Sequence, residues 1–261
     1  LDLFFGRMKK LGITVTAILL NASKLFNSTG EEALLSKCVH PDYDDTYPHA
    51  FISAFSAKTI EGQIYYQAFV EFLASRYAAE NDDLSSLRGM IVSNEVDSQY
   101  IWGNAGRKTP EAYMEEYTEV LRLTILSSRK YYANMRVYIS LDHMFNRTFD
   151  ATEPLCFYTG RQVLELLNRF ANESGNFDWS VAYHSYPEDL RYPDFYNDRT
   201  AEFSFSTPRI TFKNIEMLPA YLSQERFLYR GKERRIILSE QGFNSREDQL
   251  SERQGAAAYC L

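Results

Sequence analysis

The chain has 261 residues, of which 45% are hydrophobic, and its formal net charge is −7. This length suffices for one large α/β domain, or two small ones, with a sizeable core. The acidic balance and the lack of any basic run argue against a nucleic-acid partner and against an anionic membrane surface. The apolar runs are far too short to cross a bilayer, so no membrane partner is expected.

Cysteine and aromatic content narrow the possible chemistry. The three cysteines, Cys38, Cys156 and Cys260, are widely separated and form no Cys-x-x-Cys pair, so a zinc or redox motif is not indicated. Aromatic residues make up 15% of the chain, with 19 Tyr and 18 Phe. They indicate either a Tyr-rich core and surface or an aromatic-lined cleft for a ligand with apolar faces, such as a sugar.

Apolar residues at helical spacing alternate with short β-branched runs. The helices are predicted at residues 2–11, 62–79, 110–132 and 159–172, with one ending near 229 and one beginning at 251. Capping patterns support three of these starts: Thr109 before a proline, Thr159 with Gln162, and Ser251 with Gln254.

Five strands are predicted between the helices. They cover residues 13–20, 89–94, 136–143, 179–184 and 234–240. In the last strand the run Ile236-Ile237-Leu238 has no polar alternation, which predicts a strand covered on both faces, as in a parallel sheet.

The strict alternation of strands and helices predicts a parallel sheet with right-handed crossovers. The links from strand to helix are long, and two of them, 24–61 and 185–213, are very long. Long loops at the carboxyl ends of strands are typical of the active face of a TIM barrel. We therefore expect a single α/β domain over residues 1–261, a TIM (β/α)8-type barrel, unless the two long loops contain further short strands.

Two of the predicted strands end in a glutamate. Glu95 follows Val92-Ser93-Asn94, and Glu240 follows Leu238-Ser239. A retaining glycosidase needs two such carboxyl groups about 5–5.5 Å apart, one to protonate the leaving oxygen and one to attack the anomeric carbon. Because 145 positions separate the pair, only a closed or strongly curved sheet would bring their strand ends face to face.

These residues resemble the large clan of retaining TIM-barrel glycoside hydrolases (clan A), most nearly an uncharacterised bacterial glycosidase-like family. In that clan an Asn-Glu pair closes strand four and supplies the acid/base, and a second Glu closes strand seven as the nucleophile. The resemblance implies that Glu95 is the acid/base and Glu240 the nucleophile, with Asn94 on the sugar 2-hydroxyl. It places His184 at the end of strand six, beside the nucleophile.

The chain also departs from the clan pattern. Val96 follows the Asn-Glu pair, where a proline is more typical, which leaves the substrate open. By this count the chain supplies strands three to seven only. We therefore expect a barrel that is incomplete in this chain, truncated at both ends.

Side chains at strand ends or in the loops that follow them are further candidates for contact with a sugar. They are Asn21, Trp102, His143 and Tyr186. The tryptophan could equally pack beneath a loop.

Two other functions compete with the glycosidase. The strand-end residues Asp142, His143, His184 and Glu240 could bind a divalent metal, as in barrel isomerases and metal-dependent hydrolases. However, the chain has no His-x-His or His-Glu-x-x-His pattern, and a metal site would leave Asn94-Glu95 unexplained. The other alternative is a non-catalytic carbohydrate-binding barrel, which the presence of both glutamates disfavours. We expect a carbohydrate substrate and neither a metal nor a cofactor.

Overall fold

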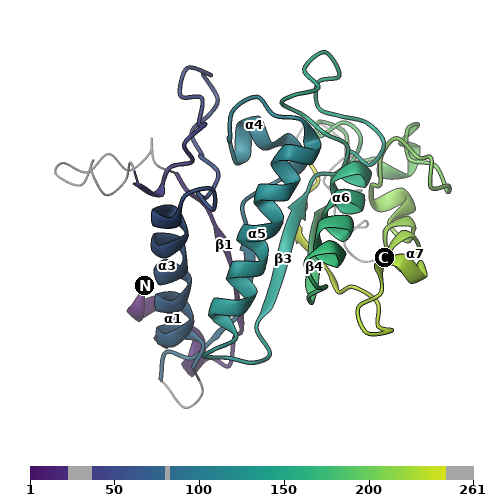
Figure 1. Cartoon of the computed structure of the whole chain (residues 1–261). Coiled ribbons are helices and arrows are strands. Elements are labelled where there is room, and N and C mark those ends of the chain that lie inside the picture. Colours follow the sequence, from purple (N-terminus) through teal and green to yellow (C-terminus); the bar gives the residue numbers. More distant parts are fainter. Residues whose placement is uncertain (23–36, 80–82, 245–261) are drawn as a thin grey trace.

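Five parallel strands form one curled sheet, a half-barrel flanked by helices (Figure 1). The computed structural model describes residues 1–22, 37–79 and 83–244. The strands are β1 (Val15–Leu19), β2 (Leu87–Val92), β3 (Arg136–Leu141), β4 (Trp179–His184) and β5 (Ile236–Glu240). They lie side by side in chain order. All five predicted strands are confirmed, and so is their parallel arrangement.

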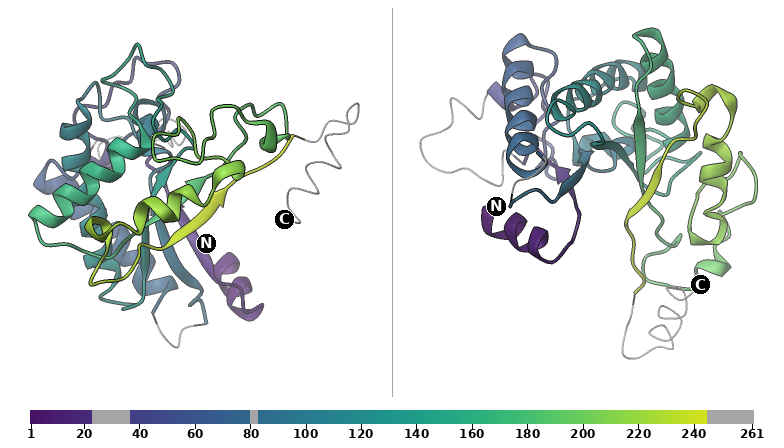
Figure 2. Two further views of the ribbon diagram at one scale, coloured as in Figure 1. Left: turned by 90° about the vertical axis from the view of Figure 1, so that its right-hand side faces the viewer. Right: turned by 90° about the horizontal axis from the view of Figure 1, so that it is seen from below.

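The helices between the strands pack along one face of this sheet (Figure 2). They are α3 (Ile60–Tyr77), α5 (Pro110–Ser128), α6 (Gly160–Glu173) and the short α7 (Met217–Leu222), while α1 (Asp2–Lys10) precedes β1 and α4 (Gln99–Trp102) follows β2. Helix α5 packs between α3 and α6. Within the described ranges, no helix is both long enough and apolar enough to cross a membrane.

Threonines fix the starts of the three long helices. The hydroxyls of Thr59, Thr109 and Thr159 each accept a hydrogen bond from a backbone N–H in the first turn. These contacts satisfy donors that have no partner inside the helix. The cap expected at Thr109 is therefore confirmed, and so is the threonine half of the capping box expected at Thr159. The one expected at Ser251 lies outside the described residues.

The two faces of the sheet have different cores. The large core lies between the sheet and the helices, and Val92, Val137, Ile139 and Val181 point into it. On the other, concave face, a small cluster joins Ile91, Tyr138, Ala182 and Ile237. Parallel strands present alternate side chains to the two faces, so this pattern follows from the register of the sheet.

The expectation that β5 is covered on both faces was wrong. Within the described sheet β5 has a single neighbour, β4, and Leu238 is 37% exposed. Ile236 and Ile237 are only half-buried. A continuous apolar run predicts a strand, but it does not predict whether that strand lies at the edge or in the middle of the sheet. The helix expected to end near 229 is also shorter, because α7 stops at Leu222.

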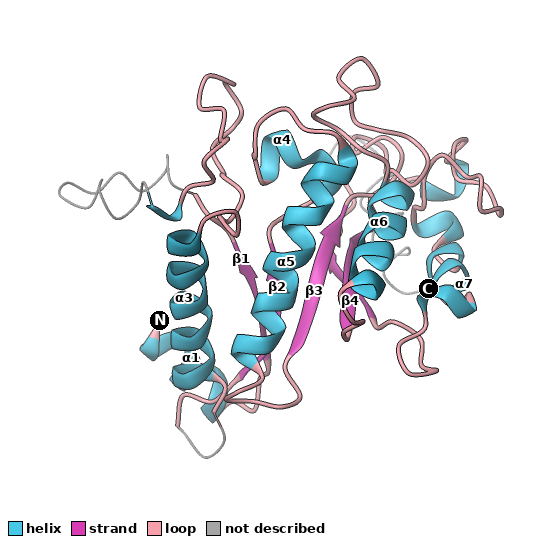
Figure 3. Ribbon diagram, viewed as in Figure 1, coloured by secondary structure: helices cyan, strands magenta, loops and turns pink. Residues whose placement is uncertain are grey.

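Loops gather at the end of the sheet to which the strand arrows point (Figure 3). In the described part of 24–61 the chain forms isolated bridges, including Asn21 with Ser53 and Ser53 with Asn104, and no named strand. Loop 185–213 makes only the bridge between Met144 and Arg209. The long loops therefore lie at the carboxyl ends of the strands, as predicted, and their described residues add no strand to the sheet.

Helix α3 joins the first long loop through a close backbone approach at Gly62. A Cβ at this position would collide with both the side chain and the backbone carbonyl of Ser56. We expect Gly62→Ala to lower the free energy of unfolding by about 1–3 kcal/mol, although alanine favours helix. Chemical denaturation would measure the loss. The control Ile64→Ala, at a side chain that is 60% exposed in the same helix, should change stability by less than about 0.5 kcal/mol. Equal stability of the two variants would contradict the close approach.

Candidate active site

A cleft of about 870 Å³ opens at the carboxyl ends of the strands. Four carboxylates line it, together with a set of aromatic rings. The carboxylates are Glu95, Asp142, Glu188 and Glu240. The rings are Tyr47, His49, Phe51, Trp102, His143, Phe149 and Tyr186. Such a cleft can hold a ligand that has both apolar faces and hydroxyl groups.

Glu95 is aimed by an unusual backbone just past β2. Ser93 has φ 62° and Glu95 has φ 34°, both in the left-handed region that non-glycine residues rarely adopt. Such residues cost about 1–3 kcal/mol each and persist only where the surroundings fix them. Here the backbone N–H of Glu95 donates to Ser140 Oγ on β3 over 3.1 Å. The strained turn and this hydrogen bond together fix the position of the Glu95 side chain.

Glu240 is the last residue of β5, and a change of register aims it. The pairing of β4 with β5 shifts between Tyr183 and His184, so that His184 pairs with Glu240. Such irregularities re-aim side chains near functional sites. The hydroxyl of Tyr186 donates to Glu240 Oε1 over 3.0 Å, and the Glu240 side chain is 45% exposed.

The buried imidazole of His184 connects the two glutamates. Its Nδ1 lies 2.8 Å from Glu95 Oε1 and 3.8 Å from Glu240 Oε2. The two carboxylate oxygens can therefore be no further apart than the sum of these distances, which is compatible with the separation of about 5–5.5 Å in retaining glycosidases. His184 Nε2 lies 3.3 Å from Ser140 Oγ. Since that oxygen already accepts from Glu95, its own hydrogen can go to Nε2, which leaves Nδ1–H to donate to Glu95.

The environment of Glu95 favours its protonated form. Burial is the largest influence and raises the pKa of Glu95, and the negative charges of Asp142 and Glu240 add to the rise. The hydrogen bond from His184 opposes it. The Glu95 side chain is 15% exposed, three times less than that of Glu240. Two carboxyl groups that face one another thus occupy different environments.

The contact between the acidic residues Asp97 and Asp142 was not predicted from the sequence. Asp97 is fully buried in the turn after Glu95, and its Oδ1 accepts from the backbone N–H of Asp142 over 3.2 Å. Burial, then the charges of Asp142 and Glu95, hold the pKa of Asp97 well above its usual range. Burial would also raise the pKa of Asp142, but the imidazole and the backbone N–H of His143, both 2.5 Å from Asp142 Oδ1, outweigh burial and lower that pKa. The spacing Glu95-x-Asp97 was the only sequence signal for this contact.

The structure brings most of the predicted site residues together. Trp102, His143 and Tyr186 line the cleft, and His184 lies behind its floor. Asn94 is half-buried and does not line the cleft, so its contact with a sugar stays a prediction.

Asn21 does not reach the cleft. Its side-chain amide donates to the carbonyls of Cys38 and Ala54, at 2.8 and 3.3 Å. It lines a separate pocket with Leu20 and Phe55. The first long loop folds back over the end of β1 and engages this side chain, which the sequence pattern did not indicate.

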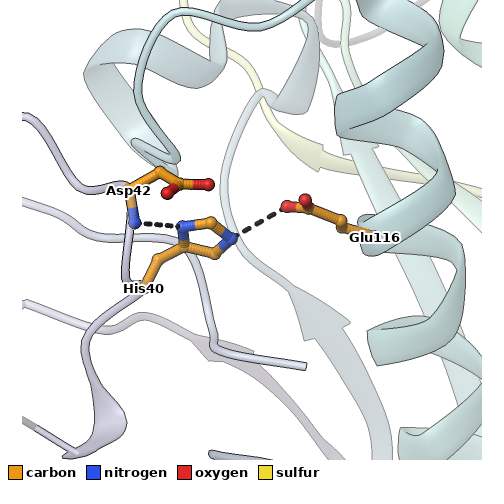
Figure 4. Close-up of side chains that lie close together, drawn as sticks. All are labelled: His40, Asp42 and Glu116. Carbon is orange, nitrogen blue, oxygen red and sulfur yellow. Dashed lines mark hydrogen bonds and ion pairs between the residues drawn. The ribbon is translucent and has the colours of Figure 1, made fainter. Parts of the chain in front are cut away.

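The rival metal set Asp142, His143, His184 and Glu240 is not gathered around one point. Among the described residues, the group whose potential ligand atoms all lie within 4.8 Å of one another is His40, Asp42 and Glu116 (Figure 4). This second group lies between the first long loop and helix α5, not among the residues that line the cleft.

Internal hydrogen bonds and ion pairs account for the group in Figure 4. The backbone N–H of Asp42 donates to His40 Nδ1 over 3.1 Å, so Nε2 carries the ring hydrogen and donates to Glu116 over 2.9 Å. Neither ring nitrogen then has a free lone pair for a metal. Lys108 Nζ lies 2.7 Å from Asp42 and 3.1 Å from Glu116, and Lys58 also pairs with Asp42. His40, Asp42 and Glu116 therefore belong to an ion-pair network that attaches the first long loop to α5.

Glycoside hydrolases are among the solved structures with a similar fold. A glucosidase from Croceicoccus marinus is 11% identical, with a TM-score of 0.56 over 99% of this chain and 41% of that chain. CelM2, a bifunctional glucanase-xylanase from a metagenome library, is 14% identical with a TM-score of 0.46, over 75% and 42%. A Paenibacillus polymyxa xyloglucanase from Glycoside Hydrolase Family 44 is 14% identical with a TM-score of 0.40, over 85% and 44%. The chain thus spans less than half the length of each of these proteins, and at 11% identity the glucosidase shows a shared fold alone.

Comparison by sequence assigns the chain to a family. No curated protein matches it. The model of the "Family of unknown function (DUF5722)" matches residues 1–261, so the chain belongs to this family.

Proposed function

We propose that this protein is a retaining glycoside hydrolase in which Glu240 is the nucleophile and Glu95 the acid/base. One observation carries the proposal: the carboxylates of Glu95 and Glu240 face a single nitrogen of His184 at the floor of an aromatic-lined cleft. The likeness in fold to a glucosidase supports it. The parallel half-barrel also supports it, because barrel enzymes carry their active sites at the carboxyl ends of the strands.

The two environments suit two different roles. In the first step, Glu240 attacks the anomeric carbon while Glu95 gives its proton to the leaving oxygen, and a covalent glycosyl-enzyme forms. In the second step, Glu95, now ionised, takes a proton from water, and the water oxygen displaces Glu240. The buried Glu95 holds its proton to higher pH, as an acid must, whereas the more exposed Glu240 accepts a hydrogen bond from Tyr186.

The direct test of this proposal is the configuration of the first-formed product. A panel of aryl glycosides of different sugars would identify a substrate, and proton NMR would then follow the anomeric signal of the released sugar at early times. We expect the product to appear with the configuration of the substrate before mutarotation sets in. Release of the opposite anomer would rule out double displacement, and no hydrolysis of any glycoside would contradict the enzyme assignment.

After burial, the charge of Asp142 should contribute to the upper pH limit of activity. Activity is lost as pH rises because Glu95 loses its proton, and the negative charge of Asp142 raises the pKa of Glu95. Asp142→Asn removes that charge, so we expect the alkaline limb of kcat/KM to move to lower pH, by roughly half a unit to one unit. The measurement is the pH profile of kcat/KM for an aryl glycoside.

A matched control separates this charge effect from general damage. Glu188 also lines the cleft but is not among the main influences on the pKa of Glu95. Glu188→Gln should therefore leave the alkaline limb in place. A shift to higher pH in Asp142→Asn, or an equal shift in both variants, would contradict the coupling of Asp142 to Glu95.

A further inference from the structure

The lining of the cleft contains more acidic than basic side chains. Four carboxylates line it, and no lysine or arginine is found among its described lining residues. The two histidines of the lining, His49 and His143, are the nitrogen bases present, and His143 lies 2.5 Å from Asp142.

Glu188 is a carboxylate of the cleft outside the proposed catalytic pair, and its surroundings favour its charged form. Its Oε2 accepts from the backbone N–H groups of Arg199 and Thr200, at 2.7 and 2.9 Å. Burial would raise the pKa of Glu188, but the hydrogen bonds from Thr200 and Arg199, together with the positive charge of Arg209, outweigh it and lower that pKa. The guanidinium of Arg209 lies 3.8 Å from Glu188 Oε1 but is buried and does not line the cleft. Glu188 therefore presents a fixed carboxylate to the cavity.

Two rings of the cleft lining are each held by another ring. Tyr47 packs on Tyr100 with ring centroids 4.8 Å apart, and Phe149 packs on Phe157 at 5.2 Å. Rings fixed in this way can stack on the C–H face of a sugar with little loss of side-chain freedom. The aromatic walls thus attract an apolar sugar face, while the carboxylates repel a negative charge carried on the same sugar.

We propose that the sugar units bound beside Glu95, Glu188 and Glu240 are uncharged, and that the cleft rejects uronic acids and sulfated sugars. This inference rests on the proposed function, because it assumes that a carbohydrate occupies the cleft. The carboxylates accept hydrogen bonds from neutral hydroxyls, whereas an anionic sugar would bring a like charge into a cleft whose described lining holds no lysine or arginine to attract it.

Binding to matched sugars tests the inference without requiring turnover. The protein would be the Glu95→Gln variant, which keeps three of the four carboxylates and slows hydrolysis. The probes would be gluco-, xylo- and galacto-configured oligosaccharides, each paired with its uronic acid counterpart of equal length, titrated by calorimetry. We expect at least one neutral oligosaccharide to bind and its uronate counterpart to bind at least roughly tenfold more weakly. Raising the salt from about 0.02 to about 0.5 M should narrow that gap, because the Debye length shrinks.

A substitution that removes one negative charge tests which residue is responsible. Adding Glu188→Gln to the Glu95→Gln variant should reduce the difference in affinity between a neutral oligosaccharide and its uronate counterpart. The matched control adds Glu173→Gln, at an exposed residue of α6 outside the cleft lining, and should leave the gap unchanged.

The outcomes separate this inference from the proposed function. A uronate that binds as tightly as its neutral counterpart, or more tightly, overturns the inference, and hydrolysis by the unaltered protein would then still support the glycosidase. Failure of every oligosaccharide to bind, together with no hydrolysis of any glycoside, overturns both.

Discussion

Replacement of Glu240 by glycine is expected to lower kcat/KM for a glycoside by about 10⁴-fold or more. Glu95 cannot replace the proposed nucleophile, since its carboxylate is held 2.8 Å from His184 Nδ1 and serves as the acid/base in the proposed mechanism. The fold should survive, because Glu240 is exposed and ends a strand with one neighbour in the described sheet. The measurement is kcat/KM on the best substrate of the aryl-glycoside panel, with the melting temperature as a check on folding.

Chemical rescue makes the Glu240 prediction specific to a nucleophile. Glycine leaves space at the end of β5 that a small anion such as azide can enter. Azide should then attack the anomeric carbon and give a glycosyl azide of inverted configuration, because only one displacement occurs. The matched control is Glu233→Gly, in the exposed segment before β5, which should keep its activity. A loss of less than about tenfold in Glu240→Gly, or a rescued product of retained configuration, would contradict the nucleophile role.

The strand ends of the fold could be predicted from the sequence because each strand is a short apolar run that stops at a polar residue. Val92 and Leu141 are buried, and polar residues follow within two positions. This pattern placed Glu95 and Glu240 at the same edge of a parallel sheet. It could not say that β5 is half-exposed, because exposure depends on what lies beside a strand rather than on the residues in it.

The surroundings of the glutamates could not be predicted, because separate segments supply them. The contact of Asp97 with Asp142 joins the turn after β2 to the end of β3. The left-handed backbone at Ser93 and Glu95 could not be predicted, because neither residue is a glycine. The pairing of the strands, rather than the local propensity of each segment, brings these groups together. The register of that pairing cannot be derived from one sequence alone.

The long loops set a similar limit on the cleft walls. Tyr47 and Phe51 reach the cleft because the loop that carries them is attached to the structure at both sides. Ser53 forms bridges with Asn21 and with Asn104, and the Asn104 amide oxygen accepts from the backbone N–H of Asp44. The aromatic content of the chain predicted that rings could line a cleft, but the path of this loop decides which rings do so.

The second large effect is expected from Glu95→Gln, and it should depend on the leaving group. Glutamine keeps the shape of the side chain but has no proton to give, so a glycoside with a poor leaving group should lose about 10²–10⁴-fold in kcat/KM. A dinitrophenyl glycoside needs little protonation of its leaving oxygen, so its first step should be affected far less. The measurement is kcat/KM for a series of aryl glycosides of rising leaving-group pKa, with Glu173→Gln as the matched control of unchanged activity.

The dependence on the leaving group distinguishes an acid from a residue that only positions the substrate. Loss of a positioning residue would slow all members of the series by a similar factor, whereas loss of the acid makes the plot of log kcat/KM against leaving-group pKa steeper than that of the unaltered protein. The alkaline limb of the pH profile should also disappear, because Glu95 is the group whose deprotonation produces it. If the variant keeps both the shallow plot and the alkaline limb, another group is the acid, and Asp97, two residues away and with a pKa raised by burial, is the next to replace.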